Sequence, residues 1–168
     1  MAEVLFNGMT CGLYGNLPET GVQAPAFALT GSDLSEIKLS NFAGKNVILN
    51  VFPSLDTPVC ASSVRKFNQE AASLPNTQVI CVSMDLPFAM SRFCTAEGIE
   101  NLKVASAFRS PVFGKAYGLV IENGPLRGLL ARCVIVIDTK GIVKYIDLVG
   151  EITEEPDYQA ILEEARKL

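Results

Sequence analysis

The sequence contains no histidine, and this absence excludes several kinds of catalytic site. Ser–His and Cys–His pairs, in which an imidazole activates the nucleophile, cannot be built. Zinc is also disfavoured, because no two cysteines have the spacing of metal ligands and no imidazole completes a set. The cysteines are odd in number and widely spaced, which argues against a secreted disulfide framework. They are Cys11, Cys60, Cys81, Cys94 and Cys133.

The chain also lacks an excess of positive charge and long apolar runs. The formal net charge is -4, so the chain has no electrostatic footprint for nucleic acid or anionic lipid. Its apolar runs are too short to span a bilayer, and residues 1–10 do not resemble a signal peptide. We therefore expect a cytoplasmic protein that binds neither nucleic acid nor membrane and needs no metal or organic cofactor.

What is present fits one globular domain. The chain has 168 residues, of which 49% are hydrophobic and 19% charged. A chain of this length buries enough apolar surface to fold without disulfides or structural metals. Because internal repeats and long linkers are absent, we expect a single domain over residues 1–168.

The clearest pattern is a βαβ unit in the middle of the chain. Residues 46–52 and 78–84 are apolar runs typical of buried strands. Between them, Val64, Phe67 and Ala71 recur at helical spacing, which predicts a helix over about 60–74. A strand, a helix and a strand in this order imply a parallel pair with a right-handed crossover.

The flanking patterns complete an α/β domain. The first forty residues predict an N-terminal β-hairpin and a lead-in, and Pro87 predicts the start of a helix that runs to about residue 97. After it come a short strand, a short helix ended by Gly118, a hairpin around "TKG" and an amphipathic C-terminal helix. We expect a mixed central sheet with helices on both faces.

The stretch "FPSLDTPVC" places Cys60 in the first turn of a helix, just beyond the carboxyl end of a strand. Open α/β sheets bind ligands at this position. Free N–H groups and the partial positive charge of the helix start both favour thiolate over thiol. Thr57 can direct its hydroxyl at the sulfur, and Pro53 and Pro58 stiffen the turn. The alternative is that Cys60 is a small buried hydrophobic residue.

Arg132 is the second anomaly, because it lies in the apolar run "LLARCVIVID". Arginine is almost never fully buried unless it is paired. Its partner is either the Cys60 thiolate or a structural anion, and Asp56 could equally hold the guanidinium. Cys94 lies on the helix that follows, as either a functional thiol or a core residue.

Several stretches together resemble one family. The spacing of Pro53, Thr57 and Cys60, with "DLPFAMSRFCTAEG", "GPLRGLLARCVIVID" and "EITEEPDY", is similar to the thiol peroxidase subgroup of atypical two-cysteine peroxiredoxins. The resemblance covers essentially the whole chain. It implies a thioredoxin-like fold with an N-terminal β-hairpin.

The resemblance also implies roles for single residues. Cys60 matches the peroxidatic cysteine, Cys94 the resolving cysteine, Thr57 the hydrogen-bonding threonine, Pro53 the shielding proline and Arg132 the guanidinium beside the sulfur. The expected activity is reduction of hydrogen peroxide and organic hydroperoxides through a sulfenic acid and an intramolecular disulfide, with thioredoxin as reductant and a homodimer as the assembly.

Two other functions remain open on the sequence alone. One is a peroxide sensor or thiol-disulfide relay on the same fold, and the other is a binding module with inert cysteines. Three apolar side chains near the motif favour organic hydroperoxides as substrates: Phe52, Leu55 and Phe88.

Overall fold

The computed structural model describes residues 2–168, which form two sheets and four α-helices. The strands are β1 (Glu3–Phe6), β2 (Met9–Tyr14), β3 (Ala28–Gly31), β4 (Glu36–Lys38), β5 (Asn46–Val51), β6 (Thr77–Ser83), β7 (Lys103–Ser106), β8 (Val120–Ile121), β9 (Cys133–Ile137) and β10 (Val143–Leu148). The helices are the 3-10 turn η1 (Leu39–Phe42), α1 (Pro58–Ala71), α2 (Pro87–Glu97), α3 (Pro111–Ala116) and α4 (Tyr158–Arg166).

The main sheet has seven strands in the order β10-β9-β5-β6-β7-β3-β4. Strands β5, β6 and β7 run parallel, whereas the remaining pairs are antiparallel. The predicted mixed sheet and the central βαβ unit are therefore confirmed. Strand β9 lies beside β5 although more than eighty residues separate them, which brings the residue before β9 to the carboxyl end of β5.

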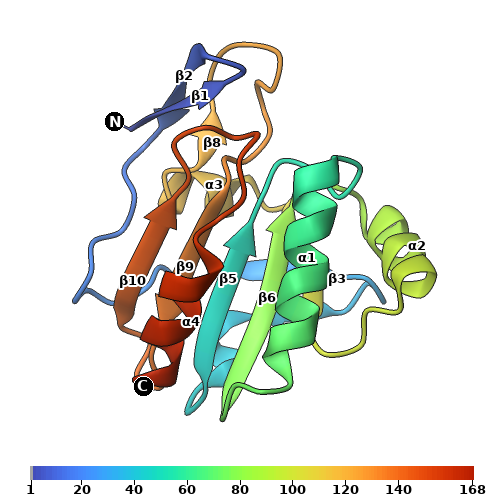
Figure 1. Ribbon diagram of the computed structural model, residues 1–168, viewed down its shortest axis with the longest axis vertical. Coiled ribbons are helices and arrows are strands. Elements are labelled where there is room, and N and C mark those ends of the chain that lie inside the picture. The colour runs from blue at the N-terminus through green and yellow to red at the C-terminus, as the bar shows by residue number, and fades with distance from the viewer. Residues whose placement is uncertain (1) are drawn as a thin grey trace.

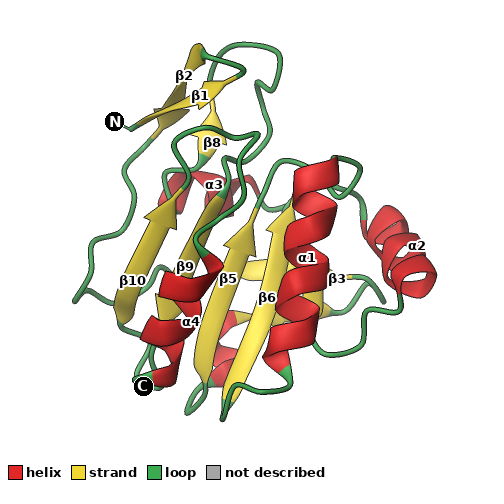
Figure 2. Cartoon of the chain, in the orientation of Figure 1, coloured by secondary structure: helices red, strands yellow, loops and turns green. Residues whose placement is uncertain are grey.

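Helices cover both faces of this sheet, as predicted (Figure 2). Every residue of β5 is buried, because its side chains point alternately into two separate cores. Helices α1, α2 and α4 pack on one core, which contains Ile48, Phe67 and Met90. Helix α3 packs on the other through Phe113. Figure 1 shows α1 and α4 in front of the sheet and α3 behind it.

The predicted N-terminal hairpin is formed by β1 and β2, and β8 extends it to a second, three-stranded sheet. Residues 28–31 and 36–38 belong instead to the edge of the main sheet. In Figure 1 the small sheet lies beyond the end of the main sheet at which β5 and β6 finish and α1 begins. It therefore stands beside the predicted position of Cys60.

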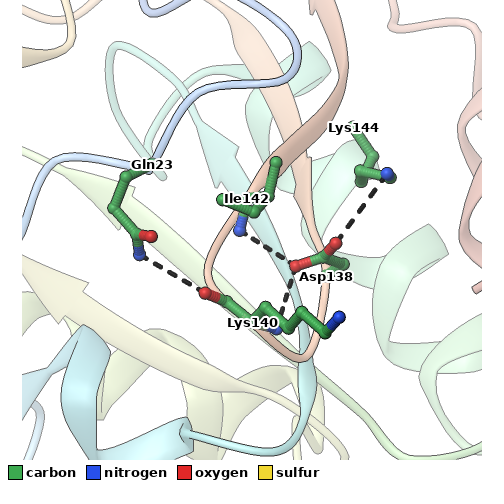
Figure 3. Close-up of polar contacts among 5 residues, drawn as sticks. All are labelled: Gln23, Asp138, Lys140, Ile142 and Lys144. Carbon is green, nitrogen blue, oxygen red and sulfur yellow. Dashed lines mark hydrogen bonds and ion pairs between the residues drawn. The ribbon is translucent and has the colours of Figure 1, made fainter.

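The hairpin predicted around "TKG" joins β9 to β10 at the opposite end of the sheet. Asp138 accepts hydrogen bonds at one carboxylate oxygen from the backbone N–H groups of Lys140 and Ile142, both at 2.9 Å (Figure 3). Its other oxygen is 3.8 Å from the ammonium of Lys144. This carboxylate fixes the turn and so helps to set the register of β9 against β5.

No helix within residues 2–168 combines the length and the apolar character needed to cross a bilayer.

Candidate active site

Cys60 is the third residue of α1 and is fully buried. Thr57 precedes the helix in an extended conformation, and Pro58 is its first residue. The helical ladder begins with the bond from the Ala61 N–H to the Thr57 carbonyl. The N–H groups of Val59 and Cys60 therefore lie in the open first turn, where the helix dipole is most positive.

The helical repeat explains why Cys60 points inward. Its side chain lies on the same face of α1 as Val64, Phe67 and Ala71, all of which are buried in one core. The sulfur is therefore held between a helix start and a sheet. Bulk water does not reach it.

Arg132 immediately precedes β9 and is only 1% exposed. Its Nε donates to the carbonyl oxygen of Ile152 at 2.9 Å, and its Nη2 donates to the Cys60 sulfur at 3.2 Å. Its third nitrogen, Nη1, is buried and has no hydrogen-bond partner within the described chain. Two of the three guanidinium nitrogens thus donate hydrogen bonds, and the third remains available.

These contacts make Cys60 unlike the other cysteines. Its sulfur alone among them accepts a hydrogen bond from a guanidinium and lies in the first turn of α1, within the described chain. Burial instead raises the pKa of Cys81 to about 12, and it also raises the pKa values of Cys94 and Cys133. Those three thiols stay protonated at neutral pH.

A cavity of about 260 Å³ opens beside this contact. Arg132 forms part of its wall, and the rest of the lining is mainly apolar. The turn before α1 and its first residues contribute Pro53, Thr57, Pro58 and Val59, and three further segments contribute Phe6, Leu126, Leu129, Ile152 and Thr153. The arrangement suits a small ligand with an apolar body and a polar end that accepts a hydrogen bond from the spare guanidinium donor.

The structure therefore brings four of the candidate residues together: Arg132 contacts Cys60, and Pro53 and Thr57 line the same cavity as Arg132. Cys94 lies apart from the cavity, on α2, where it is half-buried.

The structure decides against two contacts that the sequence left possible. Asp56 is exposed, so it does not hold the buried guanidinium; the Ile152 carbonyl does. The Thr57 hydroxyl donates to the Ser54 carbonyl at 3.0 Å and not to the sulfur. The apolar residues noted near the motif do not line this cavity: Phe52 and Leu55 are buried in the core, and Phe88 is exposed on α2.

Sequence reasoning missed most of the cavity wall. Phe6 belongs to β1, and Leu126 and Leu129 follow β8, so the small sheet and its loop supply these groups. Nothing in their local pattern distinguishes them from ordinary apolar residues. Only the pairing of β2 with β8 places their segments beside one another.

Polar contacts between exposed residues join α1, which carries Cys60, to α2, which carries Cys94, and to the turn after α2. Arg65 of α1 forms a double contact with the Glu97 carboxylate of α2, at 2.8 and 3.0 Å. One turn further along α1, the Asn68 side chain accepts hydrogen bonds from the backbone N–H groups of Glu100 and Asn101, at 3.2 and 2.9 Å. All five cysteines are free thiols in this arrangement.

Comparison with known proteins identifies similar chains. The family model described as Redoxin matches residues 19–162. The thiol peroxidase of Corynebacterium glutamicum is 54% identical over 162 residues, which cover 96% of this chain and 98% of that protein. The thiol peroxidase of Mycobacterium tuberculosis is also 54% identical over 162 residues, covering 96% of this chain and 97% of that one.

Solved structures agree with these matches. A peroxiredoxin-like protein from Aquifex aeolicus superposes with a TM-score of 0.94 at 40% identity, covering 99% of this chain and 97% of that chain. A thiol peroxidase from Chromobacterium violaceum has the same fold, with a TM-score of 0.90 at 22% identity over 98% of this chain and 95% of that one.

We expect the contact between Arg65 and Glu97 to slow the formation of a disulfide between Cys60 and Cys94. We expect Glu97→Gln to accelerate diamide-driven formation of the Cys60–Cys94 disulfide about two- to fivefold, because exposed ion pairs are weak but oppose separation of the helices. The bond to Arg65 lowers the pKa of Glu97 below its usual 4.5. The contact therefore persists above that pH, and the difference between variant and parent disappears as the pH falls through the lowered value.

Mass spectrometry of quenched samples measures this rate. Glu100→Gln is the matched control, since it removes the same charge from the same surface. Equal rates for Glu97→Gln and Glu100→Gln would show that the ion pair does not restrain the helices.

Proposed function

The chain belongs to the Redoxin family and is a thiol-dependent peroxidase, and we propose that Cys60 is the thiol that attacks the peroxide. The observation that carries this assignment is the buried Arg132. One of its nitrogens donates to the Cys60 sulfur, another is buried without a partner, and the residue forms part of the wall of the adjoining cavity. We propose that the unpartnered nitrogen donates to a peroxide oxygen beside the sulfur.

The proposed first step is a two-electron transfer from sulfur to oxygen. The Cys60 thiolate attacks the terminal oxygen of ROOH, the S–O bond forms and the O–O bond breaks. Sulfur becomes a sulfenic acid, and the leaving RO⁻ takes a proton to give ROH. Negative charge moves from the sulfur to the departing oxygen during this step, and the Arg132 guanidinium can bond to both atoms.

Ionisation of the thiol explains only part of the rate. An ordinary cysteine is already about 3% thiolate at neutral pH, so complete ionisation gains roughly thirtyfold, or about 2 kcal/mol. Enzymes lower their barriers by about 8 kcal/mol or more. The remainder must come from alignment of the peroxide and stabilisation of charge by Arg132, by the first turn of α1 and by the Thr57 region.

In the second proposed step, Cys94 resolves the sulfenic acid. The Cys94 sulfur attacks the Cys60 sulfur, a disulfide forms and water leaves. A thioredoxin-type dithiol then returns both cysteines to the thiol form by exchange and is itself oxidised. Both residues lie within intact helices in the thiol form, so we propose that local unwinding of α1 or α2 precedes the disulfide.

The cavity supports both hydrogen peroxide and organic hydroperoxides as substrates. Its apolar wall, with Phe6, Leu126 and Leu129, can cover the hydrocarbon part of an organic peroxide, and Arg132 binds the polar end.

We also propose that the chain works as one domain in the cytoplasm, as a homodimer and without binding nucleic acid. Leu86, Phe88 and Phe108 are exposed and line one surface hollow, and this apolar patch supports the dimer because such patches mark interaction surfaces. Sedimentation of the reduced protein tests it: the patch predicts twice the mass of one chain, and a monomer at all micromolar concentrations would exclude the dimer.

Cysteine replacements test the assignment of the two thiols. With a thioredoxin system, we expect Cys60→Ser to abolish steady-state peroxide consumption. Cys94→Ser should stop turnover but still consume about one equivalent of peroxide, because the sulfenic acid forms and is not resolved. Cys11→Ala is the control, since this buried cysteine lies in the N-terminal hairpin, and it should turn over like the parent. Undiminished turnover by Cys60→Ser would refute the assignment.

Arg132→Lys separates alignment of the peroxide from ionisation of the Cys60 thiol. A lysine keeps the positive charge but loses the planar fork that reaches sulfur, carbonyl and peroxide together. We expect the rate constant with peroxide to fall by more than about thirtyfold, the largest loss that thiolate fraction explains. Alkylation of Cys60 by iodoacetamide, which needs only the thiolate, should fall far less. Arg109→Lys, on an exposed loop, is the control. Parallel losses in both rates would mean that Arg132 acts only on ionisation.

A further inference from the structure

Asp85 accepts hydrogen bonds from the turn that precedes Cys60, although it belongs to the connection between β6 and α2. One carboxylate oxygen accepts a hydrogen bond from the Ser54 hydroxyl at 2.7 Å. The other accepts from the Leu55 N–H at 2.8 Å and from the Ser83 hydroxyl at 2.6 Å. Three donors thus converge on one carboxylate.

The same contacts continue to the cavity wall. The Ser54 hydroxyl, while donating to Asp85, accepts a hydrogen bond from the Asp56 N–H at 3.2 Å. The Ser54 carbonyl accepts both the N–H and the hydroxyl of Thr57, at 3.2 and 3.0 Å. Thr57 and Pro53, at the two ends of this turn, line the cavity beside Arg132. The conformation of this turn therefore depends on the carboxylate.

Asp85 is itself held firmly. Its backbone N–H donates to the Ser83 hydroxyl at 3.2 Å, and its carbonyl accepts the Ser106 hydroxyl at 2.5 Å. Ser83 and Ser106 are buried and end two neighbouring strands of the main sheet. The turn is thereby anchored to the rigid sheet and not to solvent.

We propose that Asp85 is a positioning residue for peroxide reduction: its carboxylate holds the turn at residues 53–57 so that Pro53 and Thr57 align the peroxide with the Cys60 sulfur. The inference rests on the proposed function. Asp85 touches neither the sulfur nor Arg132, whose orientation is set by the Ile152 carbonyl. Its loss should therefore disturb the alignment of the peroxide without changing how much of Cys60 is available as thiolate.

The test compares two reactions of Cys60 in Asp85→Asn and in the parent. The first is single-turnover oxidation by hydrogen peroxide, and the second is alkylation by iodoacetamide, which needs the thiolate but not the alignment. Misplacement of reacting groups by a fraction of an ångström to about 1 Å lowers rates about 10- to 100-fold. We expect a loss of this size with peroxide and a change of less than about threefold in alkylation.

Ser54→Ala removes one of the three donors to the Asp85 carboxylate. We expect it to lower the peroxide rate by less than Asp85→Asn does and to leave the alkylation rate unchanged. Urea unfolding shows whether Asp85→Asn folds, and Ser54→Ala tests the proposal if it does not. Asp33→Asn is the matched control, because its carboxylate also caps a turn, at Ser35, but far along the chain from the site. It should match the parent in both reactions.

The outcomes are distinct. A peroxide rate equal to that of the parent in Asp85→Asn and Ser54→Ala, or an equal fall of both rates, would overturn the role of Asp85. A parent protein that alkylates at Cys60 but does not consume peroxide would overturn the proposed function itself.

Discussion

The contact between Arg132 and Cys60 is the interaction on which the rest of the site depends. A guanidinium that is 1% exposed is stable only beside groups that accept its hydrogen bonds and balance its charge. In this chain a carbonyl oxygen and a sulfur do so. The requirement acts in both directions: the arginine brings a positive charge and a donor to the sulfur, and the sulfur gives the buried arginine an acceptor. A protein without histidine thus sets a cation that never loses its proton beside its candidate nucleophile.

Sheet topology makes this contact possible. Cys60 begins a helix that follows β5, while Arg132 comes 72 positions later, before β9. Antiparallel pairing of the two strands, in which Val51 faces Cys133, brings the start of β9 to the end of β5. The register therefore matters as much as the residues. A shift by one residue would move Arg132 to the other face of the sheet and leave both its charge and the sulfur without a partner.

Local chemistry explains which parts could be predicted from the sequence. The apolar run of β5 and the helical spacing of Val64 and Phe67 define the βαβ unit, and hence the helix start at Cys60. Arg132 is conspicuous as a charge in an apolar run of the sequence. The cavity wall has no such signal, because apolar side chains such as Phe6 acquire their role only when distant segments meet. The role of Asp85 has no local signal for a related reason: this carboxylate, which organises the turn before Cys60, comes from the connection after the neighbouring strand β6.

The peroxide pocket is held by buried contacts, whereas α2 near Cys94 is joined to α1 by exposed polar contacts. This difference suits a reaction in which peroxide attack and the proposed disulfide need different positions of the two sulfurs. Attack on peroxide needs a fixed pocket, and the groups that fix it are buried and anchored to the sheet through Arg132, Ser83 and Ser106. The proposed disulfide needs Cys94 to approach Cys60, and the polar contacts that join α2 to α1 near Cys94 are exposed. Exposed ion pairs and surface hydrogen bonds open at little cost, whereas buried charged contacts do not. The proposed unwinding should therefore begin at the carboxyl end of α2, where Glu97 and the following turn make these exposed contacts and Ile99 is only partly buried against the core, while the peroxide pocket retains its shape.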